Sequence, residues 1–392
     1  MQICFAKTED TKNIKNLWSY CFTDDENYVN YYFKKKYKPE NNLILKDKKE
    51  IAASLQLNPY LMIYGKTSLK ISYIVGVSSK PEKRGAGYVT KLIFEALNHL
   101  YQKGENFTIL MPIDTKIYTR YGFSNIADME SAEISLDRID YHKTGLSVRR
   151  CSGSSYIKDL QNIYTFVSQN WDNYIYRNDL YFKNLLEEAG LENTNAFISY
   201  DENSRPVSYM FFNVKFEPGK KGYVSEFLSK NALGIYELLN VVKSHYTQIE
   251  SVKIDMPADN NLKLIMKNDN KIILNKRPFI MGRVINAENM LKSNPYIKLM
   301  DFGHKLSIKV KDNIIKNNNR VFCFEKNALT VKKGPRAKYD IELDIYELTM
   351  LITSYVSADE LLFITGKSLD SEALETLKFL FPKGINYFND YV

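Results

Sequence analysis

The feature that most restricts how this chain can fold is a strand, a glycine-rich turn and a helix in direct succession. The β-branched and apolar residues of SLKISYIVGVSS (68–79) predict a strand, and the apolar periodicity of residues 88–102 predicts a helix. Between them stands KRGAG (83–87). Further strands are predicted on both sides of this helix, which indicates a mixed α/β layer and excludes a helix bundle.

The turn between strand and helix is suited to an anionic ligand. Backbone N–H groups at the start of a helix have no intrahelical partner, and the helix dipole adds partial positive charge. Gly85 and Gly87 let the backbone approach a ligand, and Lys83 and Arg84 add formal charge. A pyrophosphate fits this place. The sequence matches neither GxGxxG nor GK[ST], and a plain connection with an exposed basic loop is the alternative interpretation.

The pattern of strands and helices recurs along the 392 residues, a length that exceeds one ordinary core. A second segment repeats the alternation of predicted helices and strands seen in the first but has no glycine-rich turn. A third segment has strands followed by helices. We therefore predict three domains, at residues 1–148, 149–288 and 289–392.

Composition argues against several classes of protein. The formal charge is +8, but the lysines are spread over the whole chain, so we do not expect a nucleic-acid partner. No apolar run approaches the roughly 20 residues that cross a bilayer, and the N-terminal segment does not have the pattern of a secretory signal. We expect a cytoplasmic protein with no membrane partner. The 4 cysteines and 4 histidines are scattered, which argues against a metal site.

Several motifs together carry a resemblance to a known family. The turn resembles the coenzyme A pyrophosphate loop of the GNAT acetyltransferases, R/Q-x-x-G-x-G/A, and only Val89 replaces the small residue of the sixth position. The segment IYTRYGF (117–123) resembles the one that follows the family's fifth strand. With FTDDE (22–26), RPFIMGRVIN (277–286) and the C-terminal segment (379–392), the whole chain is similar to the Eis (enhanced intracellular survival) acetyltransferases.

The resemblance implies a fold, a cosubstrate and an assembly. The expected fold is α/β (α+β), with tandem GNAT-like mixed-sheet domains, of which the second is degenerate, followed by a domain like the sterol carrier proteins. Acetyl-CoA is the implied cosubstrate, and a homo-oligomer, specifically a hexamer, is the implied assembly. The implied cofactor positions are Val77, Ser78, Ser79, Arg84, Gly85, Ala86, Gly87, Tyr88, Val89, Thr90, Ile113 and Asp114.

The same resemblance assigns chemical roles to three residues. Tyr118 matches the general acid, and a phenol with a pKa near ~10 lies only about 1.5 units above a thiol. Core packing is the alternative role of Tyr118, and Tyr121 is the second candidate for the acid. Asp24 matches an acidic position of the substrate pocket, with a helix cap as the alternative. Val392 carries the C-terminal carboxylate, which acts in catalysis in the family, whose members usually end in an aromatic residue.

The aromatic residues of segment 379–392 predict that the tail is docked, because apolar surface is costly to leave in water. A docked tail would hold its carboxylate in a fixed place, or would merely seal the third domain. The expected function is N-acetylation of a primary amine, in an aminoglycoside, another polyamine or a lysine side chain. The alternatives are a lipid- or small-ligand-binding protein with a vestigial acetyltransferase site, and an aminoacyl-transferase, which would lack this pyrophosphate loop.

Overall fold

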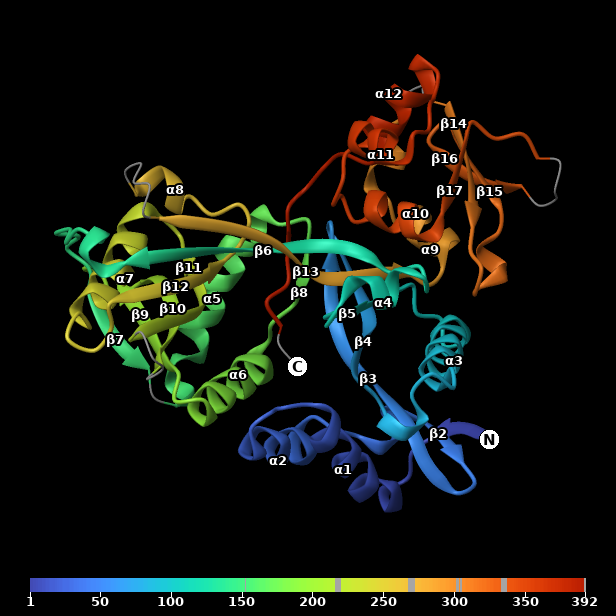
Figure 1. The fold of residues 1–392 in the computed structure, drawn as a ribbon. Coiled ribbons are helices and arrows are strands. Elements are labelled where there is room, and N and C mark those ends of the chain that lie inside the picture. Colours follow the sequence, from blue (N-terminus) through green and yellow to red (C-terminus); the bar gives the residue numbers. More distant parts are fainter. Residues whose placement is uncertain are drawn as a thin grey trace. The chain divides into compact units, whose positions relative to one another are not determined.

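The structure is a computed structural model that describes residues 1–151, 153–215, 220–266, 272–300, 303, 305–332 and 337–390 (Figure 1). It divides into two compact units. Unit 1 comprises Met1–Ala127, Asp172–Ile175 and Phe279–Val392, and unit 2 comprises Asp128–Trp171 and Tyr176–Pro278. The chain passes from one unit to the other within β6 (Ser124–Ser135) and returns within β13 (Ile273–Val284).

Unit 1 is built on a mixed sheet. Its strands are ordered β1 (Gln2–Phe5), β2 (Asn42–Asp47), β3 (Glu50–Tyr64), β4 (Thr67–Ser79), β5 (Phe107–Leu110) and the end of β13. Only β4 and β5 in this series pair in parallel; the other neighbours are antiparallel. The helix between β4 and β5 is the crossover connection that parallel neighbours require.

Helices cover both faces of this sheet. One face packs against α3 (Tyr88–Gln102), whose buried Leu92, Ile93, Leu97 and Leu100 are the apolar stripe expected from the sequence. The other face packs against α1 (Thr11–Cys21) and α2 (Glu26–Lys35). Alternate residues of β3 divide between the two faces, as strand geometry requires. Leu55 and Leu57 lie in the core with α3, whereas Gln56 and Asn58 contact Tyr32 of α2.

The C-terminal part of unit 1 is an α+β layer. Its sheet has the order β16 (Ala328–Lys332), β15 (Val321–Glu325), β14 (Lys305–Lys311) and β17 (Ile341–Asp344). Around it lie α9 (Ala287–Lys292), α10 (Ile345–Ile352), α11 (Ala358–Thr365) and α12 (Ser371–Leu380). Capping boxes start α10 at Asp344 and α11 at Ser357, so each of these helices begins on a local side-chain signal.

Unit 2 repeats the plan of the first sheet. Its order is β6, β12 (Ser251–Met256), β11 (Lys221–Ser229), β10 (Pro206–Lys215), β9 (Asn195–Tyr200) and β7 (Ser147–Cys151). Here β11 and β12 are the parallel pair, and α7 (Ala232–Ser244) connects them. The helices α5 (Ile157–Val167), α6 (Asp179–Leu191) and α8 (Leu262–Ile265) complete this unit. The mixed α/β fold with a repeated first layer is confirmed, while the domain limits at 148 and 288 stay a prediction.

Among the described residues, none of the helices is both long enough and apolar enough to span a bilayer.

Candidate active site

The strand before the glycine-rich turn is irregular where it approaches the turn. Ser78 lies opposite Ser54, but Val75 lies opposite Gln56, so β4 has one more residue than β3 in this interval. The result is a β-bulge at residues 76–77, with Gly76 at a left-handed φ of 60°. Such bulges redirect the strand and its side chains locally.

The parallel pairing beside this bulge also ends early. The register of β4 with β5 runs from Ser72–Thr108 to Ile74–Leu110, after which β4 continues to Ser79 beside β3. Among the described residues no strand pairs with the β5-facing backbone edge of residues 75–79, so an extended ligand can pair with it, although the Ser79 carbonyl already accepts from Cys21 Sγ at 3.5 Å. This edge includes Val77, Ser78 and Ser79, three of the predicted cofactor positions.

The glycine-rich turn fits an anion. Gly85 and Gly87 have φ values of 85° and 74°, which favour glycine, and a Cβ atom at either would meet nothing within 4 Å. The turn is therefore open above the backbone. Gly87 is the N-cap of α3, and no described side chain caps this helix. The N–H groups of the first turn, at residues 88–90, remain for a pyrophosphate.

Positive charge at the turn comes from one of the two predicted residues. Lys83 Nζ lies 3.0 Å from Asp47 Oδ2, which also accepts a hydrogen bond from the Tyr88 hydroxyl at 3.0 Å. The contact with Lys83, aided by Tyr88, lowers the pKa of Asp47. Asp47 thus offsets the charge of Lys83, whereas Arg84 is exposed and makes no ion pair with a described residue. Asp47 was not identified from the sequence as the partner of Lys83, because the two residues are far apart in the chain.

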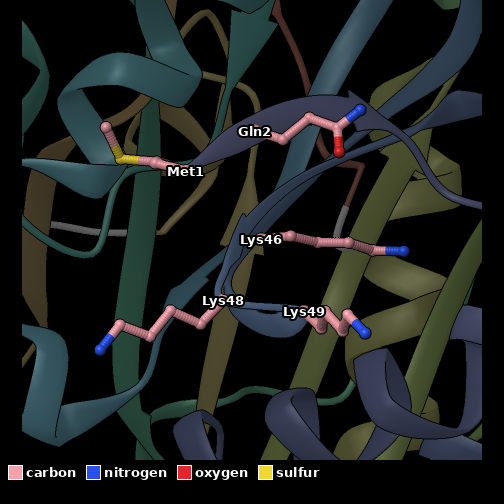
Figure 2. A pocket seen from close by; sticks show the side chains of 5 residues that line it. All are labelled: Met1, Gln2, Lys46, Lys48 and Lys49. Atoms are coloured by element: carbon pink, nitrogen blue, oxygen red, sulfur yellow. The ribbon is translucent and has the colours of Figure 1, made fainter.

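A second basic feature lies at the turn between β2 and β3. Met1, Gln2, Lys46, Lys48 and Lys49 line a hollow of about 530 Å³ (Figure 2). Lys46 is paired with Asp10 at 2.8 Å, and Lys48 and Lys49 lie at the tip of the turn. None of the predicted cofactor residues lines this hollow, so it is distinct from the turn at residues 84–87.

The tyrosines of the IYTRYGF segment lie on and just after α4 (Thr115–Thr119). Asp114 caps this helix by accepting from the Lys116 N–H at 2.9 Å, and Ile113 beside it is 80% exposed. Tyr118 and Tyr121 are both buried in the core with α3. The Tyr121 hydroxyl lies 2.8 Å from Thr90 Oγ1, so this tyrosine contacts the predicted cofactor loop directly.

Burial changes the acidity of Tyr118. Its ring packs edge-on against Phe123, and desolvation raises its pKa to about 12. The pKa of Tyr118 then lies about 3.5 units above that of an ordinary thiol near ~8.5. The difference expected from unperturbed pKa values was smaller, about 1.5 units. Tyr118 therefore keeps its proton at neutral pH and is a hydrogen-bond donor there.

Asp24 lies at the end of the α1–α2 connection and is exposed. Its carboxylate accepts a hydrogen bond from Trp18 Nε1 at 2.8 Å. The helix cap considered for Asp24 belongs to its neighbour, because Asp25 accepts from the Asn27 N–H at 2.8 Å and is the N-cap of α2. Asp24 thus has no part in capping that helix.

The C-terminal tail is docked as far as the structure describes it. β18 (Asn386–Tyr387) pairs in parallel with β8 (Asn173–Ile175), and residues 386–390 are all buried. The Tyr73 hydroxyl donates to the Asp390 carbonyl at 3.0 Å. Docking of the tail is confirmed. Val392 lies outside the described residues.

Family comparisons match three parts of the chain. Residues 2–126 and residues 173–284 each match an acetyltransferase (GNAT) domain, and residues 287–389 match a sterol carrier protein domain. The chain belongs to the GNAT acetyltransferases. With two such domains it is an acyltransferase, and GNAT acetyltransferases use an acyl-CoA.

Solved structures share the complete fold. A probable N-acyltransferase from Enterococcus faecalis V583 has 18% identity and a TM-score of 0.84, covering 100% of this chain and 99% of that one. A GCN5-related N-acetyltransferase from Anabaena variabilis has 18% identity and a TM-score of 0.82, with 100% coverage of both. Eis1 from Mycobacterium abscessus has 13% identity and a TM-score of 0.78, also with 100% coverage of both. No curated protein matches by sequence.

The second GNAT domain repeats the strand geometry of the first, and protein side chains lie at its bulge and at its helix start. β11 has a bulge at Ser225, and its parallel register with β12 ends at Val224–Ile254. Beside the bulge, the buried Glu226 carboxylate accepts two hydrogen bonds from Arg177 at 2.8 and 2.9 Å. The Asn231 side chain caps α7, so a protein group occupies the helix start that is uncapped in the first domain.

In the part of the chain that the structure describes, no three His, Cys, Asp or Glu side chains gather as metal ligands would.

Proposed function

We propose that this enzyme transfers an acetyl group from acetyl-CoA to a primary amine, carried by an aminoglycoside, another polyamine-like molecule or a lysine side chain. The observation that supports it most is the open edge of β4 leading into an uncapped, glycine-rich start of α3. When bound, acetyl-CoA supplies the thioester whose acetyl group the amine accepts. The other steps follow from residues of this chain.

The cofactor positions divide into two groups. In the segment Val77, Ser78 and Ser79, the N–H groups that face away from β3 would hold the pantetheine arm and support the developing oxyanion, because fixed backbone dipoles need no reorganisation during the reaction. The loop Arg84, Gly85, Ala86, Gly87, Tyr88, Val89 and Thr90 would hold the pyrophosphate. Ile113 and Asp114, at the start of α4, would border the cofactor.

Tyr118 is the proposed general acid. With its pKa raised to about 12 it stays protonated, so it can donate a hydrogen bond to the leaving sulfur before the proton moves. As the amine nitrogen bonds to the acetyl carbon it becomes positively charged, and the C–S bond breaks with the Tyr118 proton passing to sulfur. The phenolate then regains a proton from that nitrogen, which leaves a neutral amide and free thiol. Tyr121 remains the second candidate, since its hydroxyl contacts Thr90.

The acceptor amine would be held by carboxylates. Asp24 is exposed and fixed by Trp18, which suits it to attract an ammonium group. The C-terminal carboxylate of Val392 would act as base or would orient the amine. An α-carboxyl with a pKa near ~3.5 is a very weak base toward an ammonium, so the base role requires burial that raises this pKa or a water between the two groups. The hexameric assembly and the cytoplasmic location also stay predictions.

Calorimetry with acetyl-CoA tests the cofactor site. Arg84→Ala removes the unpaired cation of the loop and should weaken binding by about 1–3 kcal/mol, the range for a charged hydrogen bond. Arg205→Ala, at an exposed arginine of unit 2, is the matched control and should bind as the wild type does. Absence of binding by the wild-type protein would overturn the proposed function.

A further inference from the structure

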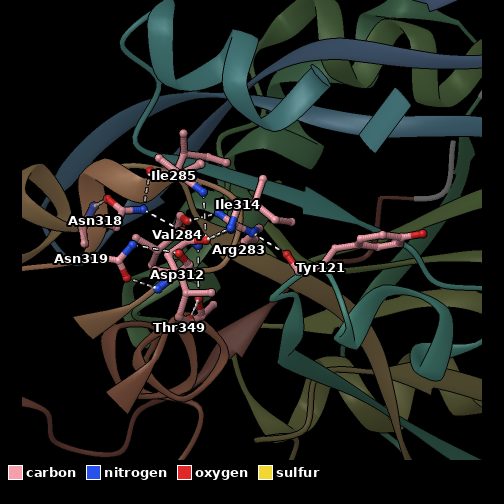
Figure 3. Close-up of polar contacts among 12 residues, drawn as sticks. Tyr121, Arg283, Val284, Ile285, Asp312, Ile314, Asn318, Asn319 and Thr349 are labelled. Carbon is pink, nitrogen blue, oxygen red and sulfur yellow. Dashed lines mark hydrogen bonds and ion pairs between the residues drawn. The ribbon is translucent and has the colours of Figure 1, made fainter. Parts of the chain in front are cut away.

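Arg283 is a fully buried cation that the chemistry described so far does not use. Its side chain is 0% exposed and donates three hydrogen bonds: Nε to the Tyr121 carbonyl at 2.7 Å, Nη1 to the Val284 carbonyl at 2.8 Å and Nη2 to Asp312 Oδ1 at 2.8 Å (Figure 3). A guanidinium directs its N–H donors to acceptors within one plane from three different nitrogens, whereas an ammonium has three donors on one tetrahedral nitrogen.

Asp312, the anionic partner of Arg283, is itself held in place. Its Oδ1 atom accepts from the N–H groups of Ile314 and Ile315 at 2.9 and 3.0 Å, and its Oδ2 accepts from Asn318 Nδ2 at 2.9 Å. These residues belong to the sterol carrier protein domain. The guanidinium of Arg283 is therefore anchored on that domain.

The third acceptor of Arg283 belongs to the tyrosine segment of the first GNAT domain. The Tyr121 N–H donates to the Tyr118 carbonyl at 2.9 Å, so one turn carries both tyrosines. Gly122 completes that turn with φ of 83°, and a Cβ atom there would lie 2.5 Å from Ile345 Cγ2 of α10. The turn is thus held by a hydrogen bond from Arg283 on one side and by contact with α10 at Gly122. The Tyr121 hydroxyl also hydrogen-bonds Thr90 in the first turn of α3.

Stability alone does not require this arrangement. A buried ion pair is often no more stabilising than apolar residues of the same volume, because both charges must be removed from water. The guanidinium does fix the direction of the Tyr121 carbonyl. An apolar side chain could fill the space but could not aim that carbonyl.

We propose that Arg283 is a positioning residue for acyl transfer: through the Tyr121 carbonyl it sets the turn that carries Tyr118 and Tyr121 against the first turn of α3. The sterol carrier protein domain, through Asp312 and Ile345, supplies the rigid support. This inference rests on the proposed role of these tyrosines. A small displacement of such a turn should lower kcat because transfer depends on close alignment of the reacting groups.

The test is Arg283→Lys, which keeps a cation beside Asp312 but cannot reproduce the three-acceptor geometry. We expect kcat to fall by roughly 10- to 100-fold at temperatures well below the melting transition. The matched control is Thr376→Val in the same domain, which removes the hydrogen bond from the Lys305 N–H to Thr376 Oγ1 (3.3 Å) and the one from Thr376 Oγ1 to the Glu372 carbonyl (2.9 Å), neither of which involves the tyrosine turn or its support. It should keep the wild-type kcat at a similar melting temperature.

A second variant separates the loss of positioning from a loss of folding. Arg283→Met combined with Asp312→Asn leaves no lone buried charge and should show the same loss of kcat with a cooperative melting transition. Tyr118→Phe and Tyr121→Phe are tested separately. If at least one of them is inactive but the folded Arg283 variants keep the wild-type kcat, the role of Arg283 is overturned while the acetyltransferase function stands. Equal losses of kcat in Arg283→Lys and Thr376→Val would also overturn it. Failure of the wild type to bind acetyl-CoA would instead overturn the proposed function.

Discussion

Trp18 Nε1 donates a hydrogen bond to the Asp24 carboxylate at 2.8 Å, and the same indole covers Gly76 at the bulge of β4. The ring also stacks on Tyr32, with 4.8 Å between ring centroids. One side chain therefore connects the carboxylate proposed for the acceptor with the strand proposed for the cofactor. This relationship leads to two of the predictions below.

Asp24→Asn should raise KM for a polyamine acceptor while acetyl-CoA binding stays unchanged. The amide can still accept from Trp18, so the change removes charge and keeps the contact. An exposed charge contributes modestly, so we expect a rise of roughly two- to fivefold at low salt that shrinks at high salt. Asp25→Asn is the matched control, since asparagine also caps a helix well. Equal KM values for Asp24→Asn and wild type would remove Asp24 from the acceptor site.

Gly76→Ala should destabilise unit 1. A Cβ atom at residue 76 would lie 2.3 Å from Trp18 Cζ3, and its φ of 60° is unfavourable for alanine. Overpacking and backbone strain together should cost about 2–4 kcal/mol in chemical denaturation. Gly65→Ala is the control, because its φ is 55° and its Cβ would meet nothing within 4 Å. Similar losses in the two variants would show that the Trp18 contact is unimportant.

Tyr118→Phe should lower kcat by roughly 10²-fold, as loss of a general acid does, with folding little changed. Near-normal turnover in this variant together with an inactive Tyr121→Phe variant would move the acid role to Tyr121. Steady-state kinetics on the two variants, each with its melting temperature, decide between the tyrosines.

The raised pKa of Tyr118 also predicts a pH dependence of stability. Its pKa rises from 10.0 to about 12 through burial, so between these values the unfolded chain loses the phenol proton while the folded chain keeps it. The free energy of unfolding should therefore decrease as pH rises through this window. Denaturation curves of the Tyr118→Phe variant should show a shallower decrease than those of the wild type. Identical slopes would mean that Tyr118 titrates normally.

Residues added after Val392 should abolish acetyl transfer while acetyl-CoA binding and melting temperature stay nearly unchanged. The tail is buried through Asp390, and Tyr73 holds its carbonyl at 3.0 Å, so an extension would displace only the free carboxylate. The same residues added before Met1 are the control. Wild-type turnover in the C-terminally extended protein would show that the carboxylate has no catalytic part.

Local sequence patterns were sufficient for the elements around the cofactor loop. The buried stripe of α3, with Leu92 and Leu97, follows from apolar residues at helical spacing, and the turn at Gly85 and Gly87 follows from residues that tolerate a positive φ. The docked tail followed from its aromatic content. Each of these features is encoded within a few consecutive residues, so the sequence alone determined them.

The tertiary structure decided which side chains meet across long intervals. Asp47 forms an ion pair with Lys83, and Arg283 donates hydrogen bonds to both Tyr121 and Asp312. Sheet pairing and domain packing bring these distant segments together. No local spacing encodes these partners. Burial likewise set the acidity of Tyr118, since desolvation depends on everything packed around the ring and not on its neighbours in the chain.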